Sequence, residues 1–524
     1  MRTGHWIRLA GILAAAILLR VWALDWGIPD QFRLTSLHPD EEAAVSAMVL
    51  LIADPMMRRP YNGFAFIKGA GYFYSGMAAI RAGTAAGLVR LDDQERPLDL
   101  SSYRRIFFLA RSVSLLFSLG TILLSFLAGR LLFGPRVGEI AAGLEAISPL
   151  SVVNAHWATP DCGQAFWIMV CLYLVARSAW DWRWLLAGIL AAGVGAAFKY
   201  PGASALVLVF AAAWFLDSEH RYRRIALAGL GLPLFVVGFL LVFPAVLTNP
   251  AKLIAVLGFD STYAGGVAWD SVRHILQYPW FLAKTTGVIL PLWGLAAILY
   301  SLVRPRRREA WIILCWLLPY LAFMTASWFV VARYALPWVS VLGLLMARMT
   351  KELLDRTQPR FRPWTIAGFS LAGLLILAPT CFHLRTMSRP DPRDLAAAWI
   401  RSHVPLHTAV AFTPSLNNDQ AFVVPLDPEQ YQIIPLSFRQ DQDASSYLAQ
   451  PFRLLAANER AWAEGFLPKP PSQALFWKQV MESKNWQLLA RFSNRPAWPG
   501  LFLRGQLPED FSYLYQETRI YQRK

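Results

Sequence analysis

The sequence is poor in charged residues for its length. Only 16% of its 524 residues are charged, whereas soluble globular proteins carry about 25%. Hydrophobic residues make up 56% of the chain. This composition is not that of an ordinary soluble enzyme, and it predicts a polytopic membrane protein.

Cysteine is scarce as well. The chain has only four cysteines, Cys162, Cys171, Cys315 and Cys381, and each lies in an apolar run or at its end. No Cys-x-x-Cys pair and no Cys/His spacing of a zinc site occurs. The pattern therefore indicates neither a disulfide framework nor a structural zinc site.

Acidic residues are outnumbered by basic ones, which gives a net charge of +16. Such an excess could suggest nucleic acid, but the basic residues lie in short loops between apolar runs. That placement is the orientation signal of membrane proteins. All the Arg- and Lys-rich loops fall on one side of the predicted spans, so we expect that side to be cytoplasmic.

The apolar runs predict about eleven transmembrane helices, since a span needs about 20 apolar residues. They cover residues 6–27, 106–132, 137–154, 161–178, 184–198, 201–217, 225–246, 285–303, 310–328, 333–349 and 364–382. The short pair 184–198 and 201–217 could instead be one kinked element. We interpret the first run as a retained anchor. The N-terminus is then cytoplasmic and the C-terminus is on the outer side.

The composition changes after the last span, so we predict a transmembrane domain at 1–382 and a small outer α/β domain at 383–524. Asp391 as N-cap and Pro392 at the first helical position predict an amphipathic helix that ends before Pro405. Runs typical of β-strands follow at 408–412, 432–438, 486–492 and 518–521.

Three consecutive acids, Asp40, Glu41 and Glu42, follow Pro39 in the first outer loop, residues 28–105. One interpretation is a helix start, because carboxylates in the first turn complement the helix dipole. The other is functional, because a carboxylate held at a helix start can act as a general base.

A second carboxylate, Asp161, follows Thr159 and Pro160 in the next outer loop, which also carries His156. Thr159 could cap the following helix, with Pro160 at its first position. The predicted spans nevertheless place Asp161 at the same membrane face as Asp40.

Three cations break the positive-inside pattern and fall at that outer face: Lys68, Lys199 and Arg333. They could simply reach toward lipid headgroups. Three cations near an acidic pair also suggest an anionic ligand, and phosphate is the natural one. Tyr200 and Tyr334 adjoin two of these cations and, with His156, are candidates for lining the substrate.

Two charged residues lie deep within predicted spans, Arg20 in the first and Glu145 in the third. We interpret them as a buried ion pair that holds the bundle together. Glu145 is also the best argument for a transporter or lipid flippase, which would use both residues as mid-membrane coupling sites.

Several motifs together resemble those of the GT-C membrane glycosyltransferases, in particular the bacterial protein O-mannosyltransferase and lipid A aminoarabinose transferase group. They are the acidic motif Asp40–Glu42, Lys68 before the aromatic run Tyr72–Tyr74, Thr159-x-Asp161, Phe198-Lys199-Tyr200 and Arg333-Tyr334-x-x-Pro337. The resemblance covers residues 6–382, and 394–405 resembles the start of the outer domain of bacterial relatives. Where relatives often have a Pro-Pro-Leu type run after the lysine, this chain has Gly69-Ala70-Gly71.

The resemblance implies a glycosyltransferase of the bacterial inner membrane that uses a polyprenyl-phosphate sugar donor and acts on an outer-face lipid, glycan or protein acceptor. Asp40 would be the general base, with Glu41 and Asp161 as supporting carboxylates, and the reaction would invert the sugar carbon. Lys68, Lys199 and Arg333 would bind the donor phosphate. A divalent metal is possible but not required.

Two rival functions stay open at this point. A transporter or lipid flippase would depend on Glu145 and Arg20, but most acids lie at the outer mouths of spans and the chain shows no matching halves. A polymerase or ligase of surface polysaccharide would share the same type of donor.

Overall fold

The computed structural model describes residues 3–57, 63–264, 272–304, 308–326, 331–412, 423–436, 443–458, 471–494, 511 and 513–524. These residues form two compact units. The first comprises residues 1–24 and 43–381, and the second comprises residues 25–42 and 382–524.

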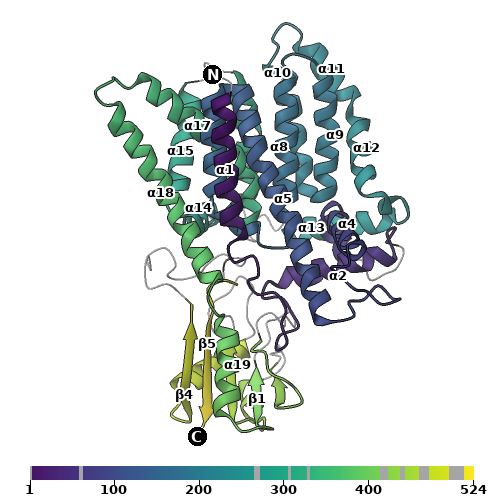
Figure 1. Cartoon of the computed structure of the whole chain (residues 1–524), viewed down its shortest axis with the longest axis vertical. Helices are drawn as coiled ribbons and strands as arrows, with labels where there is room; N and C mark the ends of the chain where they lie inside the picture. The colour runs from purple at the N-terminus through teal and green to yellow at the C-terminus, as the bar shows by residue number, and fades with distance from the viewer. Residues whose placement is uncertain are drawn as a thin grey trace. The chain divides into compact units, whose positions relative to one another are not determined.

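The first unit is helical (Figure 1). Its longer helices are α1 (Thr3–Val21), α4 (Gly71–Ala85), α5 (Leu100–Phe133), α6 (Pro135–Ile147), α8 (Asp161–Arg177), α9 (Arg183–Phe198), α10 (Leu206–Phe215), α11 (Arg221–Leu230), α12 (Leu232–Val242), α13 (Pro250–Ala264), α14 (Val272–Thr286), α15 (Ile289–Val303), α16 (Arg308–Ala326), α17 (Leu336–Arg356) and α18 (Arg362–Met387). Shorter helical pieces are α3 (Gly63–Lys68), α7 (Pro149–Asn154) and the 3-10 turns η1 (Tyr200–Ala205), η2 (Pro244–Leu247) and η3 (Ala332–Ala335). Helix α2 (Pro39–Ala53) begins in the second unit and continues in the first, and the last residues of α18, from Phe382, belong to the second unit.

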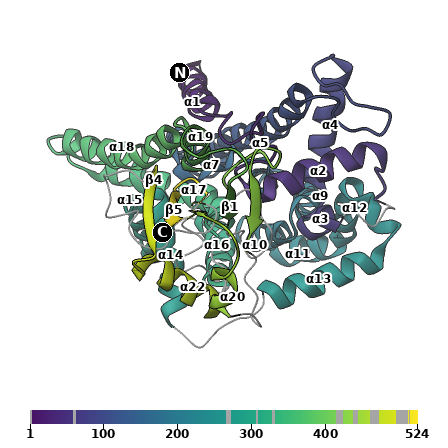
Figure 2. The same ribbon diagram turned by 90° about the horizontal axis from the view of Figure 1, so that it is seen from below.

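Within the first unit, α9 packs between α8 and α12, and α5 packs against both α6 and α8. Figure 2 shows α3 near α13, which it contacts. Each of the eleven apolar runs overlaps one or more helical pieces, although residues 327–328 of the run 310–328 lie outside the described residues.

By length and hydropathy, four stretches of the described chain could cross a membrane: α1, α5, most of α16 and the stretch 362–403 that includes α18. A fifth is possible if α11 and α12, which meet at a bend of 40°, count as one span. These apolar helices indicate a multi-pass membrane protein, and the count of eleven stays a prediction.

Breaks in the helices explain why fewer long spans are found than apolar runs. The run 137–154 is divided at Ser148, which is extended because Pro149 follows it. The predicted pair 184–198 and 201–217 is likewise divided at Lys199, whose extended backbone ends α9 before η1 begins. Gly202 makes this turn compact, since a Cβ there would lie 2.3 Å from the Gly195 carbonyl oxygen.

The second unit contains a five-stranded mixed sheet. Its strands are β1 (Ala409–Phe412), β2 (Gln432–Pro435), β3 (Leu454–Asn458), β4 (Trp486–Ser493) and β5 (Glu517–Arg523), in the order β2-β1-β3-β5-β4. β1 is parallel to β2 and β3, whereas β5 is antiparallel to β3 and β4. The four predicted strand runs overlap β1, β2, β4 and β5, and β3 was not predicted.

Alternation along the strands buries both faces of this sheet. Val410 and Phe412 face one core, to which α19 (Pro392–His403) contributes Ala396 and Ile400. Ala411 between them faces the other core. Helices α20 (Ala444–Leu448) and α22 (Pro471–Glu482) cover that second face. Helix α19 begins as predicted, with Asp391 as N-cap and Pro392 next.

Candidate functional site

Asp161 opens α8 and is buried among cations of the first unit. Its carboxylate accepts a hydrogen bond from Lys199 Nζ at 2.5 Å, and Arg333 Nε lies 3.8 Å from its other oxygen. Asp161 is 2% exposed, Lys199 8% and Arg333 6%. The structure therefore brings together three of the charged residues predicted from the sequence.

Local chain geometry positions Lys199. The break between α9 and η1 leaves its backbone extended, with φ −162° and ψ 130°. Its Nζ lies 4.2 Å from the centroid of the Tyr334 ring, a cation–π contact. The Tyr320 hydroxyl donates to the Tyr334 carbonyl at 3.2 Å, so α16 supports the turn that carries Arg333.

Lys68 is placed by a glycine corner between α3 and α4. Gly69 has φ +92°, and a Cβ there would lie 2.8 Å from the Ala197 carbonyl oxygen. The Tyr200 hydroxyl donates to the Phe66 carbonyl, which joins η1, the turn after Lys199, to α3, the helix that carries Lys68. Lys68 thereby lies within electrostatic range of Asp161. The Gly69-Ala70-Gly71 departure from the resembled motif is thus the feature that permits this close approach.

Buried polar atoms lie near Asp161 along the chain. Thr159 Oγ1, Asn154 Oδ1 and Gln164 Nε2 have no hydrogen-bond partner within the described part of the chain. The predicted cap is wrong, because α8 begins at Asp161 with Pro160 as N-cap and without a side-chain cap. Sequence reasoning also missed Gln164, although its position one helical turn after Asp161 was a usable signal.

The acidic motif belongs to the second unit. Helix α2 begins at Pro39 with Asp40, Glu41 and Glu42 in its first turn, which confirms the predicted helix start. Glu41 is fully buried and accepts a hydrogen bond from Ser36 Oγ at 2.5 Å. Asp40 and Glu42 are half-buried.

His156 is fully buried, and both of its ring nitrogens face backbone carbonyls. Nδ1 is 2.8 Å from the Val152 oxygen and Nε2 is 2.8 Å from the Trp22 oxygen. Its substrate-lining role stays a prediction, and we leave it out of the proposed site because its nitrogens are engaged. Tyr200 follows Lys199 in the chain and the Tyr334 ring contacts Lys199 Nζ, so both stay candidates for lining the substrate.

Arg20 and Glu145 are linked through Ser151. Arg20 Nη2 lies 3.0 Å from Ser151 Oγ, and that hydroxyl donates to Glu145 Oε1 at 2.7 Å. Arg20 also donates to Ser118 Oγ and to the carbonyls of Ala16, Ala146 and Glu145. These bonds join α1, α5 and α6, which agrees with a role in holding the bundle together, although Ser151 bridges the two side chains in place of the direct ion pair that was predicted.

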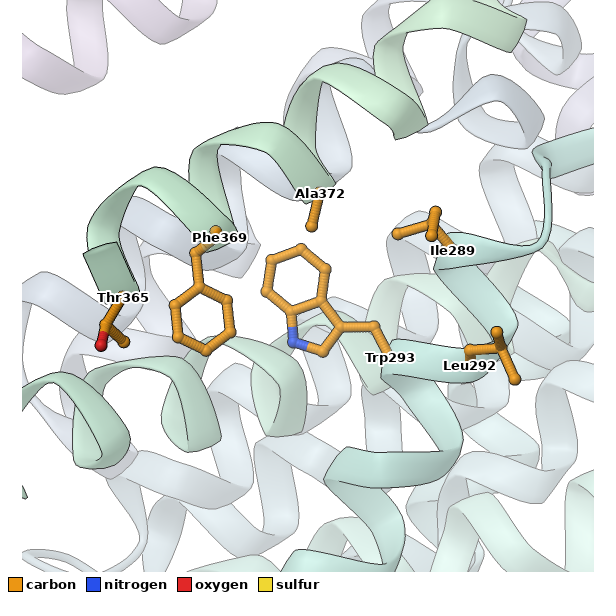
Figure 3. A pocket seen from close by; sticks show the side chains of 7 residues that line it. Ile289, Leu292, Trp293, Thr365, Phe369 and Ala372 are labelled. Carbon is orange, nitrogen blue, oxygen red and sulfur yellow. The ribbon is translucent and has the colours of Figure 1, made fainter. Parts of the chain in front are cut away.

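A pocket of about 480 Å³ lies elsewhere, between α15 and α18. Figure 3 shows the rings of Trp293 and Phe369 beside each other in it, and their centroids are 5.4 Å apart. Its lining is apolar apart from Thr365. It contains none of the predicted site residues.

Among the described residues, no group of three or more His, Cys, Asp or Glu side chains is arranged to hold a metal ion.

Comparison with known proteins agrees with the helical scaffold. Residues 106–248 match the family model described as dolichyl-phosphate-mannose-protein mannosyltransferase. No curated protein matches the sequence. The chain resembles the GT-C membrane glycosyltransferases, as the motifs predicted.

Two solved structures show this likeness along the whole chain. ArnT from Cupriavidus metallidurans bound to undecaprenyl phosphate is 16% identical with a TM-score of 0.53, over 99% of this chain and 98% of that one. The oligosaccharyltransferase AglB from Archaeoglobus fulgidus, in complex with an inhibitory peptide and a dolichol-phosphate, is 12% identical with a TM-score of 0.54. That match covers 100% of this chain and 88% of AglB. At these identities the likeness is one of fold.

Proposed function

We propose that the chain is an integral-membrane glycosyltransferase that moves a sugar from a polyprenyl-phosphate donor to an acceptor at the outer membrane face. The group of cations gathered at Asp161 carries the proposal. Lys199 and Arg333 lie 2.5 Å and 3.8 Å from the two Asp161 carboxylate oxygens, and Lys68 lies within electrostatic range. Lys and Arg side chains gathered in this way suit a phosphate, because charge-assisted hydrogen bonds to its oxygens are strong.

The same cations suit the chemistry of such a donor. When the bond between the sugar carbon and the phosphate oxygen breaks, the electron pair leaves with the phosphate. Lys199 and Arg333 would stabilise the charge that develops there. Such a leaving group needs no general acid, unlike the departing oxygen in glycoside hydrolysis. The fold neighbours bound to undecaprenyl phosphate and dolichol-phosphate support this choice of donor.

Asp40 is proposed as the general base. The acceptor oxygen or nitrogen would form a bond to the sugar carbon on the face opposite the phosphate, and its proton would pass to the Asp40 carboxylate. Attack from that face inverts the sugar carbon. Glu41 and Asp161 would orient the acceptor or tune Asp40, and Tyr200 and Tyr334 would line the substrate.

A divalent metal is an optional part of the proposal. An Archaeoglobus fulgidus oligosaccharyltransferase of this fold is known in complex with Zn and sulfate, at 14% identity and a TM-score of 0.52 over 86% of this chain and 68% of that one. A transfer assay with and without EDTA, followed by added Mg²⁺, Mn²⁺ or Zn²⁺, would decide whether a metal is needed.

The proposed membrane arrangement follows the loop charges. Residues 1–382 form the catalytic membrane domain and residues 383–524 an outer domain, in a bacterial inner membrane with the N-terminus in the cytoplasm. Cysteine labelling from outside intact cells would test it. Labelling of an introduced cysteine at Lys524, with none at Thr3, is the expected result.

The central test is transfer by purified protein from a panel of radiolabelled polyprenyl-phosphate sugars. Wild type should release or transfer sugar from at least one donor, and Asp40→Asn should reduce turnover at least 100-fold, as expected for loss of a general base. Asp93→Asn, at an exposed position in the same outer loop, is the matched control and should keep wild-type turnover.

Near-normal turnover in folded Asp40→Asn would overturn the base assignment. No turnover in wild type with every common donor would favour the transporter or flippase, although the bonds that engage Arg20 and Glu145 count against it. A sugar polymerase or ligase would be recognised by its product, a lengthened or transferred glycan chain.

A further inference from the structure

We propose that the C-terminal part of the second unit holds the acidic turn of α2 in its working position, through an ion pair between Arg33 and Asp394 that we call the loop clasp. Arg33 Nε lies 3.3 Å from Asp394 Oδ1. The two residues are 361 positions apart in the chain but belong to one compact unit. This inference rests on the proposed function of Asp40.

Arg33 organises the loop that leads to the acids. Its guanidinium donates to the carbonyls of Gly27 at 3.1 Å, Ile28 at 3.3 Å and Thr35 at 2.6 Å. The residue is only 6% exposed. A buried guanidinium is costly unless carboxylates compensate it. Asp30 in the loop itself lies 3.6 Å from Arg33, and Asp394, the nearer of the two at 3.3 Å, is the partner from the C-terminal part.

The loop is closed tightly at its base. The Leu37 N–H donates to the Gly27 carbonyl at 3.0 Å. Gly27 has φ +63°, and a Cβ there would lie only 2.6 Å from Leu37 Cβ. Any side chain at position 27 would therefore push Leu37 away, two residues before α2 begins at Pro39.

Contacts continue from the loop to the acids themselves. The Ser36 hydroxyl accepts from the His38 N–H at 3.1 Å and donates to Glu41 at 2.5 Å. The His38 ring is fully buried and packs edge-on against Tyr513, with centroids 4.9 Å apart. Movement of the loop would therefore move Glu41 and its neighbour Asp40.

Asp394 is itself held rigidly. It lies in the first turn of α19, whose start is fixed by the Asp391 cap. The buried Arg393 donates to Asp391 at 2.6 Å and to the Tyr513 carbonyl at 3.2 Å. Tyr513 therefore contacts both His38, in the loop before α2, and Arg393, the residue before Asp394.

Arg33 and Asp394 are therefore positioning residues that act through Asp40, and the C-terminal part of the second unit becomes a component of the transferase machinery. Asp394→Asn weakens the clasp while nearly preserving side-chain volume. Asp394→Glu keeps the charge and should restore it. Arg491→Gln removes an ion pair with Glu517 elsewhere in the same unit and is the matched control.

Two readouts are needed in the full-length protein. The first is hydrogen exchange of the loop amides, for which Leu37 is the reporter. Asp394→Asn should accelerate this exchange about tenfold or more, while Asp394→Glu and Arg491→Gln leave it near wild type. The second is transfer kinetics, where Asp394→Asn should lower kcat about tenfold with the donor KM within about twofold of wild type.

The two proposals fail separately. Unchanged loop exchange in Asp394→Asn overturns the clasp whatever the kinetics show. Accelerated exchange with unchanged kcat, in an enzyme that Asp40→Asn inactivates, shows a structural contact without a positioning role and also overturns the inference. Absence of transfer by wild type refutes the proposed function, while the exchange arm still reports on the clasp contact.

Discussion

The ion pair between Asp161 and Lys199 offers a quantitative test of the charged cluster. Lys199→Met removes the cation at 2.5 Å and leaves Asp161 buried with Arg333 at 3.8 Å. Breaking a buried pair by removing one partner costs about 3–5 kcal/mol when the remaining charge has no other partner. Arg333 still compensates Asp161 in part, so we expect about 3 kcal/mol, the lower end of that range. That corresponds to roughly a hundredfold increase in local opening.

Removing both charges should cost less than the sum of the single changes. In the double variant Asp161→Asn/Lys199→Met, neither member of the pair is left as an uncompensated charge. Residues in contact typically show interaction energies of about 0.5–3 kcal/mol in such cycles. We expect a value at the upper end, since both side chains are at least nine-tenths buried.

Cys162 supplies the assay, because it adjoins Asp161 and is 1% exposed. A thiol-reactive dye can modify it only when the start of α8 opens, so its labelling rate reports the opening equilibrium. Changing the half-buried Cys315 and Cys381 to serine would remove their background signal. Cys171 is fully buried in the middle of α8 and serves as the internal reference.

Three sets of rates decide the outcome. Faster Cys162 labelling in each single variant, partly reversed in the double variant, is the expected pattern. A wild-type labelling rate in Lys199→Met, or strictly additive effects in the double variant, would refute the conclusion that the buried Asp161 and Lys199 compensate each other's charge.

Two further predictions concern backbone geometry and pH. Gly69→Ala should weaken donor binding at least tenfold, because its Cβ would lie 2.8 Å from the Ala197 carbonyl oxygen. Gly87→Ala, at φ +70° with open space around it, is the control for backbone strain alone. Equal donor KM values in the two variants would contradict this prediction. Burial opposes ionisation of Glu517, but hydrogen bonds from Arg491 and Arg519 outweigh it and lower the pKa of Glu517 below its ordinary value. The folded protein then binds this proton less tightly than the unfolded chain, so the stabilisation is complete at neutral pH and is lost as the pH falls through the folded pKa. In thermal unfolding scans Glu517→Gln should be less stable than wild type at pH 7, with the difference shrinking below about pH 4; a constant difference would contradict the assignment.

Much of the helical scaffold was predictable because burial in a bilayer leaves a simple signal, a long apolar run. The breaks in the helices were partly predictable from proline, since Pro149 follows the break at Ser148 and Pro201 lies two residues after the break at Lys199. Strand β3 was missed because Leu454–Asn458 is buried at every position and shows no alternation. Asn458 and the two alanines in it are also poor strand formers.

The charges of the site were predictable, but their pairing was only partly so. Asp161, Lys199 and Arg333 stood out because charges at apolar termini are costly. The tight partnership of Asp161 with Lys199 needed the structure, since the two lie on different helical elements. The Arg33–Asp394 contact had no sequence signal, because loop arginines are common and 361 positions separate the pair.

The division of the chain has a consequence for how the protein can be made and taken apart. The polypeptide passes between its two compact units three times, after residues 24, 42 and 381. A fragment that starts at residue 382 would therefore lack the segment 25–42 and leave Tyr513 and Asp394 without their partners. A soluble version of the second unit would need that segment joined back through a linker, and complementation by a separate 25–42 peptide would measure how much of the fold it supplies.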